Sequence, residues 1–262
     1  MPPRAARRVV ITGASSGIGR ALAIAWGARG ASVLLAARDG RALDGVAGEV
    51  RAAGGEAFAE PCDVTREEDR ARLVDRARAE MHGVDVLVNN AGRGCYGEVK
   101  DLDLAEVEAL FALNVFAPLR LTQLALPLLA AGAGTVVMVS SIAGVVAAPK
   151  MGAYAATKFA LEALSASLRA EVAGAEVRVL VVRPGPVDTP FRANAFVRNA
   201  EAGVRPRGAR AQTPEQIAER TIRAVEARRA VIETSAFVRV ASFASRVTPP
   251  VFRKVAARMA RG

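Results

Sequence analysis

The sequence predicts a doubly wound α/β fold, in which helices cover both faces of a parallel sheet. Over the first 190 residues, short runs rich in Val, Leu and Ile alternate with segments long enough for crossover helices. Several runs are almost continuously apolar, which is typical of strands buried on both faces. The expected strands, in chain order, are residues 8–12, 32–37, 56–60, 85–89, 135–140 and 177–183.

Two of the expected helices have recognisable beginnings. Residues 65–68 (TREE) and 213–216 (TPEQ) both match the capping box, and the second has a proline at its first helical position. The chain has no internal repeat and no low-complexity linker. We therefore expect a single domain followed by a basic, partly helical C-terminal extension.

The composition is that of a soluble globular protein. Of the 262 residues, 52% are hydrophobic and 24% are charged. Apolar stretches such as 135–148 are interrupted before they reach the roughly 20 residues of a membrane span, and no separate apolar signal region follows the basic N-terminus. Cys62 and Cys95 form neither a disulfide framework nor a metal-ligand spacing. We expect a cytoplasmic protein without a metal.

The net charge of +10 is confined to the C-terminal part of the chain. Residues 1–191 contain 21 Lys or Arg and 21 Asp or Glu, whereas residues 192–262 contain 15 basic and 5 acidic residues. A general drift toward arginine would spread the excess along the chain. The excess therefore has a local cause.

The first expected strand leads into TGASSGIG (12–19), which contains three glycines. A tight turn from strand to helix needs Gly13, and small residues let backbone N–H groups approach a phosphate at the helix N-terminus. The spacing is G-x-x-x-G-x-G, whereas most dinucleotide folds have G-x-G-x-x-G. A tight turn without a ligand would look similar.

The end of the second strand favours NADP(H) over NAD(H). In a nucleotide-binding βαβ unit, an acidic residue at this position binds the ribose 2′-hydroxyl of NAD. Here Ala37 is followed by Arg38, which can pair with a 2′-phosphate. The neighbouring Asp39 argues against NADP(H) unless its carboxylate faces solvent. After the third strand, Asp63 can reach an adenine amino group.

Six elements resemble the short-chain dehydrogenase/reductase (SDR) family in type, order and spacing. They are TGASSGIG, NNAG (89–92), Asn114, VSS (139–141), YAATK (154–158) and RPGPVDT (183–189), and the similarity covers residues 8 to about 190. It implies a Rossmann-type domain over 1–190 that binds a dinucleotide. It also implies hydride transfer at a carbonyl or alcohol carbon, and a homodimer or homotetramer.

The resemblance also implies which residues bind the dinucleotide. The glycine-rich turn would contact the phosphates, NNAG would lie beside the adenine ribose, and PGPVDT would pass the nicotinamide carboxamide. The implied cofactor-binding residues are Gly13, Ser15, Ser16, Gly17, Ile18, Gly19, Arg38, Asp63, Val64, Asn90, Ala91, Gly92, Tyr154, Lys158, Pro184, Gly185, Val187 and Thr189.

In this family resemblance, Tyr154 moves the proton. Tyrosine has an ordinary pKa of about 10, which is too high for acid/base work near neutrality. A fixed ammonium group favours the phenolate, and the i, i+4 spacing places Lys158 on the same helical face as Tyr154. We therefore expect Lys158 to lower the pKa of Tyr154 and to hydrogen-bond the nicotinamide ribose.

Ser141 is the residue expected against the substrate oxygen, thirteen positions before Tyr154. It follows the fifth strand, at the edge where ligands bind in open α/β sheets. Its hydroxyl can donate to a carbonyl oxygen as negative charge builds. Ser140 is the alternative, but we expect it to belong to the strand and to point to the opposite face.

Asn114 lies in an apolar helical segment, four residues before Pro118. A proline cannot donate to the carbonyl oxygen four residues earlier, so we expect a kink that frees the Asn114 carbonyl to hold a water. In the resemblance, the matching asparagine closes a proton relay that runs through Lys158 to Tyr154. The alternative is a helix break without catalytic meaning.

The resemblance places a substrate lid at residues 191–211, where Phe191, Phe196 and Val197 favour an apolar substrate. Residues 212–262 would add a helix, the last strand and the basic extension. Residues 251–259 form an amphipathic pattern with a basic face, and residues 237–247 carry an apolar stripe. This extension can dock on the fold, on a second subunit or on an anionic membrane.

Together these motifs predict an oxidoreductase that transfers a hydride between NADP(H) and an apolar ketone, aldehyde or secondary alcohol. Tyr154 would be the general acid/base. The alternative is a non-catalytic, NADP-binding regulatory or interaction protein of the same fold, but the intact Ser141, Tyr154 and Lys158 argue against it. No motif in the sequence supports nucleic-acid binding.

Overall fold

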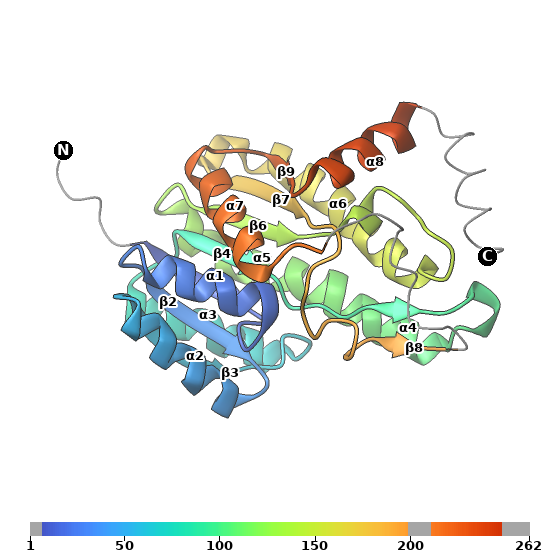
Figure 1. The fold of residues 1–262 in the computed structure, drawn as a ribbon. Coiled ribbons are helices and arrows are strands. Elements are labelled where there is room, and N and C mark those ends of the chain that lie inside the picture. The colour runs from blue at the N-terminus through green and yellow to red at the C-terminus, as the bar shows by residue number, and fades with distance from the viewer. Residues whose placement is uncertain (1–6, 199–210, 248–262) are drawn as a thin grey trace.

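The computed structural model describes residues 7–198 and 211–247. Within them, seven parallel strands form one sheet in the order β3-β2-β1-β4-β6-β7-β9, with helices on both faces (Figure 1). The strand order reverses between β1 and β4, as in a doubly wound sheet, so the predicted fold class is confirmed. Part of the expected lid (199–210) and the amphipathic pattern at 251–259 lie outside the described residues.

All six predicted strands are present, with ends within one residue of the prediction. Strand β6 ends at Val139, so Ser140 lies just beyond the strand and the expectation that it belongs to it is wrong. The seven sheet strands are β1 (Arg8–Thr12), β2 (Ser32–Ala37), β3 (Glu56–Pro61), β4 (Val86–Asn89), β6 (Thr135–Val139), β7 (Arg178–Arg183) and β9 (Val231–Glu233). Two further strands, β5 (Cys95–Tyr96) and β8 (Phe196–Val197), pair with each other away from the sheet.

Alternate residues of the strands pack on opposite layers of helices. Val9 and Ile11 contact the layer formed by α1, α2 and α7, whereas Val10 contacts the layer formed by α3, α5 and α6. The helices are α1 (Gly17–Gly27), α2 (Gly40–Ala52), α3 (Glu67–Met81), α4 (Leu104–Phe111), α5 (Ala117–Ala130), α6 (Gly152–Glu171), α7 (Pro214–Glu226) and α8 (Ala236–Val247). Short 3₁₀ turns occur at η1 (Val99–Asp101), η3 (Ile142–Gly144) and η4 (Ala173–Ala175).

One of the two predicted capping boxes is confirmed. At the start of α7, Thr213 Oγ1 accepts a hydrogen bond from Gln216 N, and Gln216 Oε1 accepts one from Thr213 N. The box predicted at 65–68 is wrong, because α3 begins at Glu67. Thr65 is engaged by Asp63, whose Oδ1 accepts from both the Thr65 amide and its hydroxyl.

The helix that carries Asn114 is irregular where the sequence predicts a break. A π-helical turn, η2 (Ala112–Phe116), separates α4 from α5, and Pro118 lies in the first turn of α5. By length and composition, the continuous helical stretch Leu104–Ala130 could cross a membrane. However, Leu110, Leu121 and Leu129 are buried in the fold, which is the ordinary reason for an apolar helix in a core.

Candidate active site

The turn after β1 can only be built with glycine. Gly13 and Gly17 have φ angles of +63° and +53°, a region that other residues rarely adopt. A Cβ at Gly13 would lie 2.9 Å from Asn90 Nδ2, and one at Gly19 would collide with the Gly13 carbonyl oxygen. Helix α1 starts at Gly17 with no acidic residue in its first turn and no side-chain cap from Ser16.

These features form a cradle of backbone N–H groups at a helix N-terminus, which fits a dinucleotide phosphate. Ser15 and Ile18 lie in the same turn and in the first turn of α1. A Cβ at Gly17 would lie 3.1 Å from the Thr189 methyl group, so the 184–189 segment borders the cradle. The structure therefore brings the predicted phosphate and nicotinamide segments together.

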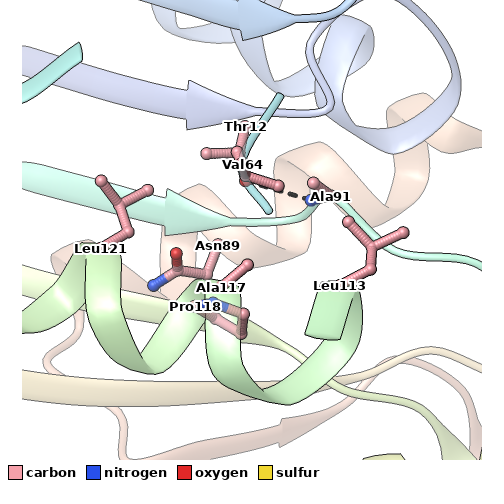
Figure 2. A pocket seen from close by; sticks show the side chains of 8 residues that line it. All are labelled: Thr12, Val64, Asn89, Ala91, Leu113, Ala117, Pro118 and Leu121. Atoms are coloured by element: carbon pink, nitrogen blue, oxygen red, sulfur yellow. Dashed lines mark hydrogen bonds between the residues drawn. The ribbon is translucent and has the colours of Figure 1, made fainter. Parts of the chain in front are cut away.

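The NNAG segment is bonded to the end of β1. Asn90 Nδ2 donates to the carbonyl oxygens of Thr12 (2.9 Å) and Gly13 (3.1 Å). Thr12 Oγ1 accepts from the amides of Asn90 (3.0 Å) and Ala91 (3.1 Å), and the second of these bonds is drawn in Figure 2. The Asn90 side chain thus holds the glycine turn in place.

Figure 2 shows a small hollow between this edge of the sheet and α5. Its volume is about 10 Å³, which is close to the space of one water molecule. Val64 and Ala91, both predicted to bind the cofactor, face this space together with Leu113. The hollow is too small for an adenine ring, so these residues offer apolar surface near the predicted adenine site without forming a finished pocket.

At the end of β2, Arg38 is exposed and forms no hydrogen bond or ion pair within 7–198 and 211–247. Asp39, the objection to NADP, caps helix α2: its Oδ1 accepts from the Ala42 amide at 3.1 Å. Burial tends to raise the pKa of Asp63, but hydrogen bonds from Thr65 and the nearby Arg38 guanidinium lower it overall. Arg38 and Asp63 therefore lie close enough to interact.

Ser141, Tyr154 and Lys158 converge just beyond the carboxyl end of β6. Tyr154 and Lys158 are buried, and the Tyr154 hydroxyl hydrogen-bonds Ser141. Ser141 Oγ also accepts from the Ala143 amide at 3.1 Å. Lys158 Nζ donates to the Val139 carbonyl at 2.9 Å and lies 5.8 Å from the centre of the Tyr154 ring. The three predicted residues are thus in one place.

The pKa shift of Tyr154 differs from the one that the sequence predicts. Burial raises the pKa of Tyr154, and the hydrogen bond to Ser141 opposes this only in part. Burial also lowers the pKa of Lys158 to about 8, while nearby Glu162 acts to raise it. The expectation that Lys158 lowers the pKa of Tyr154 is wrong for this structure, because the ammonium group points to Val139 and desolvation dominates at both residues.

Asn114 is fully buried and its amide is fully used. Its Oδ1 accepts from the Arg93 amide (3.0 Å), and its Nδ2 donates to the Arg93 carbonyl (2.9 Å) and to Thr157 Oγ1 (3.1 Å). A Cβ on Gly92 would lie 3.1 Å from Asn114 Oδ1 and 3.8 Å from Lys158 Nζ. Asn114 therefore borders the same space as Lys158, while its role in a proton relay stays a prediction.

The β5–β8 pair lies over the active site and was not expected from the sequence. The Phe191 ring packs edge-on against Tyr154, with ring centroids 5.7 Å apart, and the Arg93 guanidinium lies 4.6 Å from the centre of the Phe196 ring. Arg198 anchors the end of this strand through ion pairs to Asp103 (3.2 Å) and Glu106 (2.9 Å). Two-residue strands leave no periodic signal that could have revealed them.

The 184–189 segment is held at both ends. The Asp188 amide donates to the Gln212 carbonyl and the Gln212 amide to the Pro186 carbonyl, both at 2.9 Å, and Val187 forms a bridge with Gln212. A Cβ on Gly185 would lie 3.0 Å from Val238 of α8. This edge of the site is therefore closed by the C-terminal part of the described chain.

Sequence reasoning missed a buried ion cluster behind the site. Arg183, at the end of β7, pairs with Glu162 through two bonds of 2.9 and 2.8 Å and with Glu233 at 3.1 Å. Glu162 is one helical turn after Lys158. A charged residue that ends an otherwise apolar strand, as Arg183 does, was the available signal. Within the described ranges, no group of three His, Cys, Asp or Glu side chains is arranged for a metal.

A phosphate cradle, a half-buried serine, and a buried tyrosine and lysine at the carboxyl edge of a doubly wound sheet define an NAD(P)-dependent oxidoreductase. Residues 7–200 match the model of the short chain dehydrogenase family. The chain belongs to this family, and it is an NAD(P)-dependent dehydrogenase/reductase.

Known proteins agree with this placement. The chain is 39% identical over 194 residues to dehydrogenase/reductase SDR family member 7B of Danio rerio, covering 71% of this chain and 63% of that relative. It therefore spans less than two thirds of that relative's length. An alcohol dehydrogenase of Thermococcus sibiricus in complex with 5-hydroxy-NADP superposes with a TM-score of 0.78 at 29% identity, covering 87% of this chain and 95% of the other. A short chain dehydrogenase/reductase of Burkholderia phymatum in complex with NAD has a TM-score of 0.84 at 25% identity, with 96% of each chain covered.

Proposed function

We propose that this protein transfers a hydride between NADP(H) and an apolar ketone, aldehyde or secondary alcohol, with Tyr154 as the general acid/base. The observation that carries the proposal is the convergence of half-buried Ser141 with buried Tyr154 and Lys158 beside the glycine cradle. When bound, the cofactor supplies or accepts the hydride. The chain's own residues position the substrate oxygen and move the proton.

The proton step follows from the state of Tyr154. Burial raises the pKa of Tyr154 and so favours the protonated phenol, which can give its proton to an oxygen on which negative charge builds. Ser141 can donate a second hydrogen bond to that oxygen.

The test is NADPH oxidation over a panel of apolar carbonyl compounds, comparing the wild type with Tyr154→Phe. Loss of general acid catalysis is expected to lower kcat/KM by a factor of about 10² to 10⁴. NADPH binding, followed by fluorescence, is the control for an intact cofactor site. If the variant binds NADPH normally and turns over carbonyls at the wild-type rate, the proposed role of Tyr154 is wrong.

The preference for NADP(H) rests on Arg38. Its exposed guanidinium forms no hydrogen bond or ion pair in the described chain, where Asp63 is its acidic neighbour, and Asp39 is occupied as a helix cap. The two structural neighbours hold an NADP derivative and NAD respectively, so similarity alone does not separate the cofactors. Arg38→Ala should raise the Kd for NADPH at least about tenfold, the effect of one charge-assisted hydrogen bond to phosphate. An equal loss for NADH would overturn the assignment.

The preference for an apolar substrate rests on the side chains around Tyr154. Phe191 packs on its ring, and Phe196 and the buried Tyr96 flank the same segment. The substrate panel should therefore show lower KM values for larger apolar ketones than for small polar ones.

We also propose a homodimer or homotetramer that pairs through the helices carrying Asn114 and Tyr154. Phe116 at the end of η2 and Phe159 on α6 are 59% and 43% exposed, and large exposed apolar side chains can mark interfaces. We also propose a cytoplasmic location for the protein, as the sequence predicts. A Phe116→Glu variant that sediments with the same mass as the wild type would exclude this face as the interface.

A further inference from the structure

Helix α8 presents a stripe of large apolar side chains to solvent. Phe237, Val240, Phe243 and Val247 are 41, 68, 68 and 59% exposed. Their spacing of three, three and four residues places them on one face of the helix. In Figure 1, α8 lies at the upper right and projects from the body of the fold. We call these four residues the α8 stripe.

The opposite face of α8 fixes the helix on the protein. Val238 is fully buried and lies against Gly185 of the nicotinamide-side turn. Ser245 Oγ donates to the Val145 carbonyl at 3.3 Å, in the loop that follows catalytic Ser141. The α8 stripe is therefore exposed on a helix that is already docked, and it stands next to the loops that border the active site.

The charge of the chain indicates what covers the α8 stripe. From Ala236 to the C-terminus, the sequence has six Arg or Lys and no Asp or Glu. A second copy of this chain, docked stripe to stripe, would bring the same positive charge against itself. An anionic bilayer complements both properties, because its interior accepts the apolar side chains and its headgroups attract the cations.

We propose that the α8 stripe docks this protein on an anionic membrane surface, to which the positive charge of the C-terminal sequence adds electrostatic attraction. Docking would place the loops after Ser141 and around Gly185 close to the lipid. The inference depends on the exposed helix and the sequence charge, and it requires no particular substrate or cofactor.

The test is flotation of the full-length protein with vesicles of phosphatidylcholine alone, and with vesicles of phosphatidylcholine and phosphatidylglycerol in a two-to-one ratio. The wild type should bind the anionic vesicles and be released by high salt, because each basic residue near such a surface changes binding about fivefold. The variant Val240→Glu/Phe243→Glu should bind at least about tenfold more weakly, because it removes two apolar anchors. Both positions are exposed, so folding should be retained, as an unchanged Tm would verify.

The matched control is Val99→Glu, which adds the same charge at an apolar position that is 75% exposed in η1, outside α8. It should bind anionic vesicles almost as well as the wild type. Three results would overturn the proposal: no binding of the wild type to anionic vesicles, equal weakening by Val99→Glu and the α8 variant, or conversion of a wild-type dimer to a monomer by the α8 variant. The last result would assign the stripe to a second copy. None of these outcomes depends on NADPH turnover, so failure here is distinct from failure of the proposed activity.

Discussion

Glu162→Gln is the substitution that best tests the buried ion cluster behind the active site. The Glu162 carboxylate takes two hydrogen bonds from Arg183, and their side chains are only 14% and 8% exposed. Removing one partner of a buried pair costs about 3–5 kcal/mol. Gln keeps one acceptor oxygen and Glu233 still pairs with Arg183, so we expect a loss of about 2 kcal/mol, in the lower part of the range for charged hydrogen bonds.

The assay is thermal unfolding followed by circular dichroism. For a chain of this size, about 2 kcal/mol corresponds to a fall in Tm of about 4–8 °C. The matched control is Asp75→Asn, which breaks an exposed pair with Arg78 and should leave Tm almost unchanged. If Glu162→Gln lowers Tm no more than Asp75→Asn does, the cluster contributes no stability and the reasoning is refuted.

The same variant has an electrostatic readout at the active site. Glu162 raises the pKa of Lys158 against the larger effect of burial. Without its charge, the pKa of Lys158 should fall further below its value of about 8. Any pH dependence of turnover that reports Lys158 should therefore move to lower pH, which a purely structural weakening would not cause.

Two further predictions concern stability. Burial lowers the folded-state pKa of Lys158 to about 8, below the unfolded value of about 10.4. Between these two pH values the unfolded chain binds more protons than the folded chain. The free energy of unfolding of the wild type should therefore rise with pH from about 8 to 10.4. Lys158→Met should abolish that slope while reducing turnover, and an unchanged slope in denaturant titrations at several pH values would contradict the assignment. Thr213→Ala should destabilise the protein by about 1 kcal/mol, because it removes the confirmed cap of α7; Thr65→Ala, which caps no helix, is the comparison, and an equal loss from both would be evidence against the role of the cap.

The sequence predicts most of the sheet because burial on both faces leaves apolar runs. The strands at 8–12 and 32–37 are confirmed without any change of ends. The strand pair β5–β8 could not be predicted in the same way. Each strand has two residues, and their pairing is decided by the loops that bring residues 95–96 and 196–197 together.

The candidate site is predictable in position but not in electrostatics. The spacing of Ser141, Tyr154 and Lys158 is a local property of one strand end and one helix, so the sequence contains it. Desolvation depends on what the rest of the chain packs around these groups, including Phe191 from a distant segment. For this reason the sign of the Tyr154 pKa shift differs from the expectation.

Competition from Asp63 explains why the capping box predicted at residues 65–68 does not form. Thr65 matches the box in sequence, but Asp63 lies two residues earlier and its carboxylate is the stronger acceptor for the Thr65 hydroxyl and amide. At Thr213 no such competitor precedes the helix, and the box forms. A motif of four residues is therefore insufficient without the residues just before it.

The Asn114 side-chain amide makes the same pair of hydrogen bonds to the Arg93 backbone that a neighbouring β-strand would make. One amide group satisfies both the N–H and the C=O of Arg93, so an irregular loop gains the two hydrogen bonds that a sheet partner would give it. The conformational entropy of this loop is therefore lost when the chain folds, and it does not have to be lost again when a ligand binds. The segment after NNAG is in this sense preorganised by Asn114.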